Sequence, residues 1–156
     1  MLNIVIDTRE QRPWSFPSDR VQTQRDTLHT GDYAIVGDGC FAIERKSLDD
    51  FLGTISSGWE RFLREIGRME SPGCEPLRLI VEASVLDFCF TIDAEGNPIP
   101  PSHNHPMLSP AFVLKRIGQL SGMNVTPLFA VNRELAATVA LEMLLDRSRR
   151  LHATEN

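Results

Sequence analysis

Residues 31–50 read GDYAIVGDGC FAIERKSLDD, and this stretch organises the rest of the chain. Two mainly apolar runs within it, 32–36 and 41–46, flank a Gly-Asp-Gly turn. This pattern predicts a β-hairpin, because glycine and aspartate favour tight turns between strands. Side chains two residues apart in a strand point to the same face, so we expect Glu44 and Lys46 to lie side by side.

The predicted hairpin brings together two carboxylates and a lysine. Asp32 opens the first strand, and Glu44 and Lys46 lie at the end of the second. Carboxylates suit a hard cation such as Mg²⁺, which neutralises charge on a phosphate during phosphodiester hydrolysis. The lysine suits either activation of the attacking water or stabilisation of charge in the transition state. Arg45 faces the other side, so we expect it to anchor structure; a contact between its backbone carbonyl and the metal stays open as an alternative.

Each of these residues also has an ordinary structural explanation. Asp32 suits a turn, Glu44 suits a solvated strand face, and Ser47-Leu48-Asp49-Asp50 is a helix-capping sequence. Lysine is scarce, however, because the sixteen basic residues include only two lysines, Lys46 and Lys115. A lysine placed here by chance is therefore less expected than usual, which favours the chemical role. For the last residue of the capping run, both explanations stay open.

The N-terminal segment supplies a second group of acidic residues. Residues 2–6 read as a buried strand that runs directly into Asp7-Thr8-Arg9-Glu10. Acidic residues at the end of a central strand are well placed to complete a metal site. An ordinary charged loop is the better explanation of this segment taken alone.

Together these motifs resemble the XPF/MUS-type structure-specific endonucleases, the excision-repair group-four nuclease domain. The resemblance covers at least residues 4–66, and the order of the later elements is compatible with it. It implies an α/β, restriction-endonuclease-like core in which a central mixed sheet is flanked by helices. The motifs that carry it are Asp7-x-Arg9-Glu10, Gly31-Asp32-Tyr33, Glu44-Arg45-Lys46-x-x-x-Asp50 and Ile55-Ser56-Ser57-Gly58.

The resemblance also implies roles for single residues. Asp7, Asp32 and Glu44 become catalytic ligands of Mg²⁺, for which Mn²⁺ can substitute, and Lys46 becomes the catalytic lysine. The chain departs from the family at Trp59, where the family commonly has an arginine after the helix glycine; Arg61 and Arg64 lie one turn away. The implied supporting or DNA-proximal residues are Arg9, Glu10, Arg45 and Asp50.

The net charge of −5 is the main compositional objection to a nucleic-acid partner. Much of the acid lies in the proposed metal site, where cations would offset it. Arginine suits bidentate phosphate contacts, and we expect modest, salt-sensitive affinity for DNA. The residues expected to bind DNA are Arg9, Arg12, Arg61, Arg64 and Arg68, with Arg147, Arg149 and Arg150 forming a second basic group. Arg61, Arg64, Glu65 and Arg68 share the helix face opposite the apolar residues, and a solvated helix face explains this group equally well.

The length of 156 residues and the 42% hydrophobic content fit a single nuclease domain over 1–150 with a short tail over 151–156. Family members that cut branched DNA usually carry a helix-hairpin-helix module or a helicase domain, and none follows the last predicted helix here. We therefore expect the nuclease domain, a twin subunit or an additional DNA-targeting partner to recognise the substrate.

Cysteine usage indicates a reducing compartment. Cys40, Cys74 and Cys89 are odd in number and widely spaced, so we expect core thiols rather than a disulfide or zinc site. The sequence shows neither a signal segment nor an apolar stretch of membrane-spanning length. These features predict a soluble, cytoplasmic protein with no membrane association.

Strands and helices are predicted to alternate after the hairpin. Apolar residues at helical spacing predict a helix over 51–66 that is interrupted by a Ser-Ser-Gly break. The later predicted elements are a strand over 77–82, a helix over 111–120 capped by Ser109 with Pro110 first, a strand over 125–131 and a last helix capped by Asn132.

The last predicted helix has a wide apolar stripe. The family resemblance implies that this region contributes to a homodimer, and core packing is the alternative explanation. The stripe consists of Leu135, Ala136, Val139, Ala140, Met143 and Leu144.

Residues 87–106 are rich in proline and glycine and contain His103-Asn104-His105. Two histidines one residue apart can bind a metal or supply a base. We favour an exposed loop, because the carboxylate–lysine site already provides the chemistry and no third ligand is evident. Contact between this loop and DNA stays open, since long loops are often functional lids.

The sequence thus favours a Mg²⁺-dependent DNA endonuclease that nicks branched, flap or single-strand/duplex junction DNA in repair, recombination or phage DNA processing. One alternative is a non-catalytic subunit of the same fold that binds DNA or a partner. Another is a nuclease acting on linear duplex DNA. The intact motif favours catalysis, and the sequence does not separate the substrates.

Overall fold

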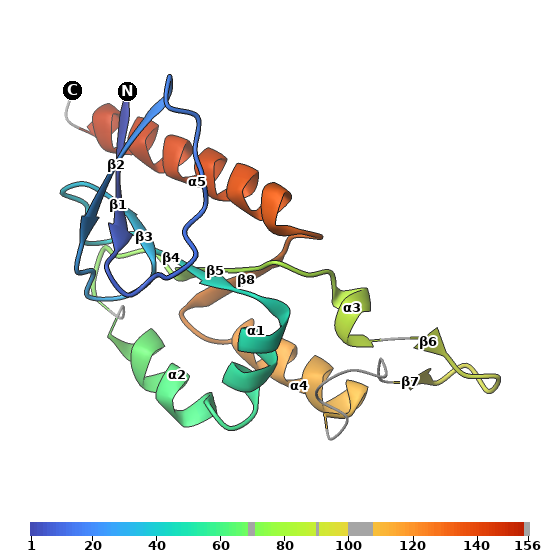
Figure 1. Cartoon of the computed structure of the whole chain (residues 1–156). Coiled ribbons are helices and arrows are strands. Elements are labelled where there is room, and N and C mark those ends of the chain that lie inside the picture. Colours follow the sequence, from blue (N-terminus) through green and yellow to red (C-terminus); the bar gives the residue numbers. More distant parts are fainter. Residues whose placement is uncertain (69–70, 90, 100–107, 155–156) are drawn as a thin grey trace.

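The computed structural model describes residues 1–68, 71–89, 91–99 and 108–154. A mixed sheet of six strands forms its centre (Figure 1). In sheet order the strands are β2 (Val21–Asp26), β1 (Leu2–Asp7), β3 (Tyr33–Ile35), β4 (Ile43–Lys46), β5 (Leu77–Val81) and β8 (Val125–Phe129). β1 runs parallel to β2, β3 runs antiparallel to both of its neighbours, and β4, β5 and β8 are parallel.

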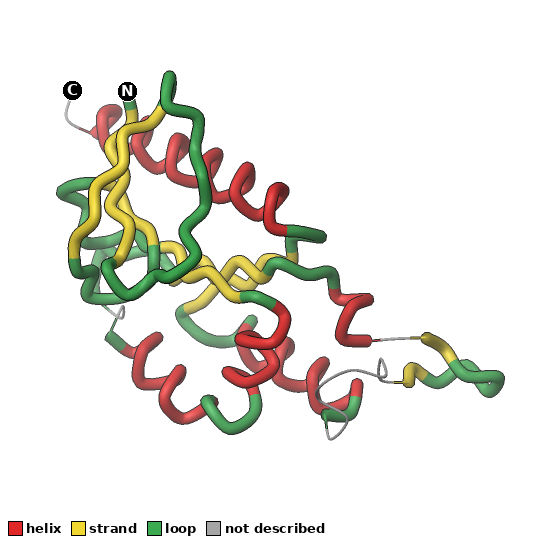
Figure 2. Tube along the Cα trace, viewed as in Figure 1, coloured by secondary structure: helices red, strands yellow, loops and turns green. Residues whose placement is uncertain are grey.

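Helices cover both faces of the sheet. Figure 2 shows the strands as a layer between helices, with both chain ends close together. α5 (Arg133–Thr154) lies on one face, and α1 (Leu48–Ile55), α2 (Trp59–Gly67) and α4 (Pro110–Leu120) lie on the other (Figure 1). This arrangement confirms the predicted α/β core. Within the described ranges, no helix is long and apolar enough to cross a membrane.

The predicted hairpin is present as β3 and β4, in strands slightly shorter than expected. Tyr33 pairs with Ile43 in antiparallel register. The turn between the strands contains Gly37 at a φ of 84°, a left-handed conformation that favours glycine. The N-terminal strand is also confirmed as β1.

Three helices begin at the predicted capping residues. The side-chain oxygens of Ser47, Ser109 and Asn132 each accept a hydrogen bond from the amide three residues later, at 3.2, 3.3 and 2.8 Å. The predicted break between α1 and α2 falls at Gly58. A Cβ at this position would lie 3.1 Å from the Gly53 carbonyl oxygen, so a larger residue would require the neighbouring backbone to shift by a few tenths of an ångström.

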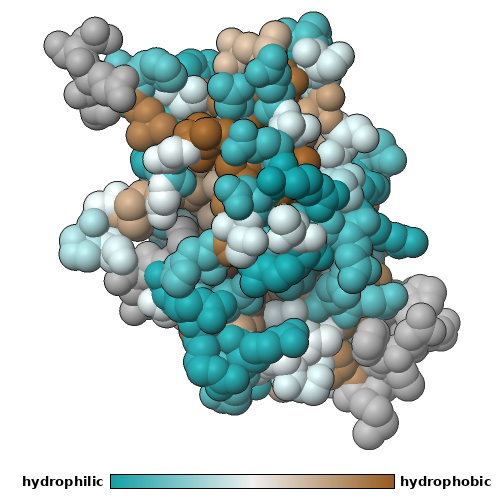
Figure 3. All heavy atoms as spheres, turned by 60° about the vertical axis from the view of Figure 1, so that its left-hand side comes forward, coloured by the Kyte–Doolittle hydropathy of each residue, from teal (hydrophilic) through white to brown (hydrophobic). Residues whose placement is uncertain are grey.

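The apolar core has two parts, one on each face of the sheet. One packs α1, α2 and α4 against β5 and β8, and Phe51, Phe62 and Leu120 are among its buried residues. The other packs α5 against β1 and β3, with Ile4 and Leu144 fully buried. The face of the molecule in Figure 3 is mostly hydrophilic, with apolar side chains gathered chiefly in its upper part.

Much of the apolar stripe on α5 belongs to this second core. Ala136, Ala140 and Leu144 have no exposed surface, so core packing accounts for them. Leu135 is 44% exposed and Val131, just before the helix, is 63% exposed. These two residues are the apolar surface that this end of α5 leaves available to a partner.

The segment after β5 contains more regular structure than predicted. α3 spans Val85–Cys89, and a small hairpin is formed by β6 (Thr91–Ile92) and β7 (Pro98–Ile99). The hairpin projects from the body of the molecule (Figure 1). The Asp93 carboxylate accepts hydrogen bonds from the amides two and four residues later, which closes the turn. The predicted His103 and His105 lie outside the described residues.

The cysteine prediction was wrong for two of the three residues. Cys40 and Cys74 form a disulfide across 34 positions of sequence. β4 and β5 run parallel, so the segments that precede them lie side by side, and the Glu75 amide donates to the Cys40 carbonyl at 3.0 Å. The pairing removes the basis on which free thiols and a reducing compartment were expected.

Candidate active site

The backbone places Asp32 between two strand ends. Its amide donates to the Ile43 carbonyl and its carbonyl accepts from the Asp7 amide, both at 2.8 Å. Gly31 precedes it at a φ of 78°, and a Cβ there would lie 2.9 Å from the Ala42 Cβ. The Gly-Asp pair is therefore needed structurally, because only glycine lets Asp32 approach β4 so closely.

Glu44 and Lys46 lie on the same face of β4, as predicted. The Lys46 ammonium is 2.5 Å from Glu44 Oε1, and both side chains are largely buried. The Asp32 carboxylate accepts a hydrogen bond from the Arg45 amide through Oδ2 at 2.8 Å. The hairpin thus places two carboxylates and one lysine together.

These residues line a hollow of about 350 Å³. Most of the sequence-predicted site residues lie on it, so strand ends and the loop after β1 meet in one place. Its lining consists of Arg9, Glu10, Gln11, Arg12, Asp32, Glu44, Arg45, Lys46 and Asp50. Asp50 also accepts a hydrogen bond from the hydroxyl of Ser47, the cap of α1, at 2.7 Å, so its structural role is present and its role in the site stays a prediction.

The electrostatics of the cluster favour a bound cation. Burial and the nearby charge of Glu44 raise the pKa of Asp32 to about 8. Burial also raises the pKa of Glu44, against the opposing effect of Lys46. Two carboxylates held close in a poorly solvated place repel each other, and a divalent cation relieves that repulsion.

The donor set fits a metal such as Mg²⁺ only in part. Asp32 Oδ1 and Glu44 Oε2 receive no hydrogen bond from the described residues, so each carboxylate keeps one oxygen for a ligand. Mg²⁺ is usually bound by one or two carboxylates plus waters and substrate oxygens, which these two can supply. No group of three or more potential ligands is assembled within the described ranges.

Lys46 carries a positive charge in this arrangement. Burial would lower its pKa, but the charge of Glu44 and their hydrogen bond outweigh burial and raise the pKa of Lys46. A protonated amine has no lone pair to accept a proton. Of the two roles considered from the sequence, the geometry therefore favours charge stabilisation over water deprotonation.

Asp7 lies beside the cluster but does not line the hollow. Its carboxylate accepts three hydrogen bonds from Arg9, at 2.7 to 2.9 Å, and one from the Leu28 amide at 2.7 Å. Burial would raise the pKa of Asp7, but these hydrogen bonds lower it. As placed, Asp7 orients Arg9, and its predicted role as a metal ligand requires these bonds to be exchanged.

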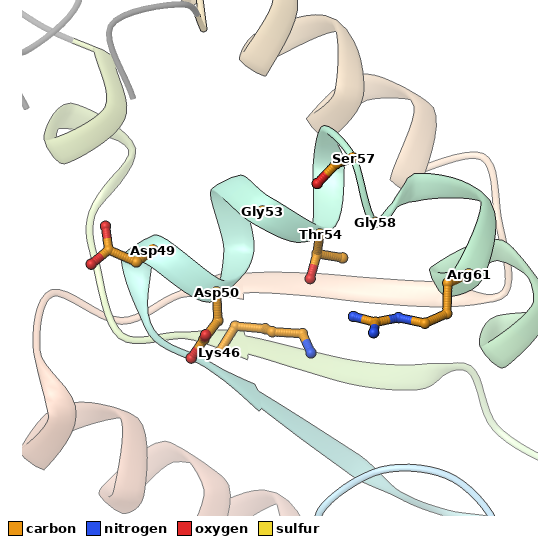
Figure 4. Close-up of a pocket in the computed structure, with 8 residues that line it drawn as sticks. All are labelled: Lys46, Asp49, Asp50, Gly53, Thr54, Ser57, Gly58 and Arg61. Atoms are coloured by element: carbon orange, nitrogen blue, oxygen red, sulfur yellow. The ribbon is translucent and has the colours of Figure 1, made fainter. Parts of the chain in front are cut away.

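A second hollow of about 430 Å³ adjoins the first, and Lys46 and Asp50 line both. In Figure 4, Arg61 from α2 and Lys46 from β4 point toward one another across it, and the Thr54 hydroxyl points into the same space. Asp49 points away (Figure 4). The part of this hollow between α2 and β4 therefore contains two positively charged side chains.

The other predicted DNA-binding arginines are more dispersed. Arg12 lies on the first hollow, Arg64 is exposed on α2, and Arg68 lines a separate pocket near the disulfide. Trp59, the residue that departs from the family pattern, is buried, and the Arg116 guanidinium lies 4.2 Å from its ring centroid.

The second basic group is occupied by structural ion pairs. Arg147 contacts Asp38 at 2.7 Å and Glu75 at 3.0 Å, and Arg150 also pairs with Glu75. Arg149 lies 4.0 Å from Asp146. The pairs with Asp38 and Glu75 connect the end of α5 to the turn between β3 and β4 and to the segment just before β5.

Sequence reasoning missed two carboxylates near the site. Glu82 follows β5 and binds the Arg45 side chain at 2.8 Å. Glu65 on α2 was assigned to a solvated face, yet its charge contributes to raising the pKa of both Glu44 and Lys46. The helical spacing predicts that Glu65 lies on the side of α2 opposite the core. It does not predict that the end of β4, with Glu44 and Lys46, lies near this side chain.

The fold and the carboxylate–lysine cluster together define a restriction-endonuclease-like nuclease domain. Comparison with known proteins is consistent with this class. The family model described as the ERCC4 domain matches residues 6–138. The chain therefore belongs to the ERCC4 domain family, which confirms the predicted resemblance.

Two solved structures share the fold. XPF from Aeropyrum pernix has 19% sequence identity and a TM-score of 0.62, over 98% of this chain and 68% of that chain. The structure described as XPF from Aeropyrum pernix in complex with DNA has 22% identity and a TM-score of 0.65, over 96% of this chain and 66% of that chain. The present chain thus spans about two thirds of either. No curated protein sequence matches it.

Proposed function

We propose that this protein is a divalent-metal-dependent DNA endonuclease that nicks branched, flap or junction DNA. The observation that carries the proposal is the cluster of Asp32, Glu44 and Lys46 on one hollow of an ERCC4-type domain. Placing two buried carboxylates close together costs folding free energy, so the presence of this cluster favours a chemical role.

Asp32 and Glu44 would hold the metal through their available oxygens, with Asp7 as a further candidate ligand. Mg²⁺ is the metal we propose, and Mn²⁺ the ion able to substitute for it, because both suit carboxylate and water ligands. When bound, the metal supplies positive charge that offsets charge on the phosphate during hydrolysis.

Lys46 would act on the charge that develops at the reacting phosphate. Its ammonium is oriented by Glu44, which holds it at the edge shared by both hollows. A preoriented cation at this position stabilises the transition state more than the ground state, because the charge is larger there.

DNA would pass across both hollows. Arg9 and Arg12 line the first hollow and Arg61 the second, with Arg64 one turn further along α2. Arginine is suited to phosphate contacts, and XPF from Aeropyrum pernix has a structure in complex with DNA. We further propose a homodimer and an additional DNA-targeting partner, since this basic track, as far as the described residues show, is short.

The direct test is cleavage of end-labelled flap, fork, four-way junction and plain duplex DNA with Mg²⁺, with Mn²⁺ and with a chelator. Asp32→Asn is compared with Asp19→Asn, a matched substitution at an exposed loop position. We expect nicking near the branch by the wild type and by Asp19→Asn, and none by Asp32→Asn or with the chelator.

Other outcomes would reassign the protein. Equal cleavage of the plain duplex would support the linear-duplex nuclease. Failure to cut any substrate with either metal, with DNA binding retained, would refute the proposed activity and support the non-catalytic subunit.

A further inference from the structure

Glu82 occupies an unusual position at the end of β5. Its backbone amide donates to the Lys46 carbonyl at 2.8 Å, so it extends the pairing of β5 with β4. Its side chain is 9% exposed and lies on the Arg45 side of the sheet, away from Glu44 and Lys46. A buried carboxylate is stable only when its oxygens are well paired.

Four hydrogen bonds from three separate parts of the chain meet on this carboxylate. Arg45 from β4 binds both oxygens, with Nε and Nη2 each at 2.8 Å. The Trp14 indole N–H donates at 2.7 Å from the loop after β1, and Arg133 from α5 donates at 3.0 Å. Burial would raise the pKa of Glu82, but the bonds from Arg45 and Trp14 outweigh it and lower the pKa.

The first connection leads to the proposed metal ligands. The Arg45 side chain is held by Glu82, and the Arg45 backbone amide donates to Asp32 Oδ2 at 2.8 Å. Arg45 also lies between Glu44 and Lys46 in the chain. Fixing the Arg45 side chain on one face of β4 therefore restricts the three functional groups on the other face.

The second connection leads to the loop after β1, which lines the other side of the hollow. Trp14 stacks on Tyr33 with ring centroids 4.6 Å apart, and its amide donates to the Tyr33 hydroxyl at 2.8 Å. Arg133 donates to the carbonyls of Arg12 and Pro13 at 2.8 and 2.7 Å. Glu82 thus also holds the segment that contributes Arg9, Glu10 and Arg12 to the site.

We infer that Glu82 is a positioning residue of the active site, one that keeps β4 and the loop after β1 in the relative placement that metal binding requires. This inference rests on the proposed function. Glu82 does not line either hollow, so it acts through Arg45 and Trp14 rather than on substrate. Residues that orient metal ligands in this way commonly change metal affinity or activity about 10- to 100-fold when replaced.

The test compares Glu82→Gln with Glu75→Gln. Glu75 is a matched control because it lies just before β5, is similarly buried and also pairs with arginines, but at the far end of the sheet from the site. We expect Glu82→Gln to lower the maximal cleavage rate about 10- to 100-fold and to raise the half-saturating Mg²⁺ concentration. Metal-free DNA affinity should change less than metal affinity, because the proposed phosphate contacts of Arg61 and Arg64 lie on α2, outside the segment that Glu82 holds.

Trp14 supplies a readout that does not depend on cleavage. Trp59→Phe leaves Trp14 as the only tryptophan, and Glu82→Gln in that background should shift the Trp14 emission maximum, whereas Glu75→Gln should not. Mn²⁺ affinity by calorimetry should fall in parallel. Trp14→Phe keeps the ring stacked on Tyr33 but loses the indole donor, and it provides a milder variant should Glu82→Gln not fold.

Three results would overturn the inference. These are an unchanged metal requirement in both Glu82→Gln and Trp14→Phe, an unchanged Trp14 emission in folded Glu82→Gln, or an equal loss of metal affinity in Glu75→Gln. If the wild type cuts no DNA, the proposed function fails. Emission and Mn²⁺ affinity still decide whether Glu82 positions the cluster.

Discussion

Replacing Lys46 with alanine tests the central feature of the site. The ammonium contacts Glu44 at 2.5 Å, with side chains 16% and 8% exposed. Removing a single preorganised group that stabilises transition-state charge typically lowers the rate by about 10²–10³, which corresponds to about 2.7–4 kcal/mol of activation free energy. We therefore expect single-turnover cleavage by Lys46→Ala to be slower by about 100-fold or more.

Stability should fall less than activity. Removing one partner of a buried ion pair costs about 3–5 kcal/mol when the remaining group stays charged. Burial raises the pKa of Glu44, so without Lys46 this carboxyl can take up a proton instead. The loss in free energy of unfolding should then be about 1–3 kcal/mol, the cost of an unsatisfied buried polar group.

The assay is single-turnover cleavage of labelled DNA at saturating enzyme and Mg²⁺, with metal-free binding followed by fluorescence anisotropy and unfolding by urea. Lys115→Ala is the control, because Lys115 is the other lysine of the chain and is exposed on α4. DNA affinity of Lys46→Ala should stay within about threefold, since one phosphate contact at most is lost. A cleavage rate within tenfold of wild type would refute the assigned role of Lys46.

Further predictions concern the surface and the ion pairs. Asp38→Asn should lower the free energy of unfolding by about 1–3 kcal/mol at pH 7. Burial would raise the pKa of Asp38, but Arg147 lowers it, so this difference should shrink progressively as urea unfolding is repeated at pH values falling below 3.8; a constant difference would contradict it. Thiol titration of the unreduced, denatured chain should find one thiol, and three would exclude the Cys40–Cys74 bond. Arg61→Ala should reduce the slope of log DNA affinity against log salt by about 0.9, and an unchanged slope would remove Arg61 from the DNA path. Light scattering should give twice the 17.5 kDa chain mass, whereas a monomer at micromolar concentration would exclude the homodimer.

The features that were predicted well from sequence depend on residues close together in the chain. The alternation of residues in β4 placed Glu44 and Lys46 on one face, and the structure has them in contact. Ser47, Ser109 and Asn132 were recognised as caps because a cap bonds to an amide three positions away. These interactions span four residues or fewer, so the local pattern contains all their partners.

Residues whose partners are distant in the sequence were missed or misassigned. Cys40 and Cys74 looked like separate thiols, and Glu65 looked like part of a solvated helix face. Glu82 looked like the end of a strand, although its partners Trp14 and Arg45 lie 68 and 37 positions away. Nothing in the spacing of these residues records which strands are neighbours.

The sequence by itself determined the hairpin, the capped helices and the carboxylate–lysine group, because each follows from periodicity and short-range hydrogen bonding. The tertiary structure alone decided what surrounds that group. The sheet order β2-β1-β3-β4-β5-β8 brings the end of β5 beside β4, and so sets Glu82 against Arg45. Strand order depends on the packing of the whole core, which no single stretch of sequence encodes.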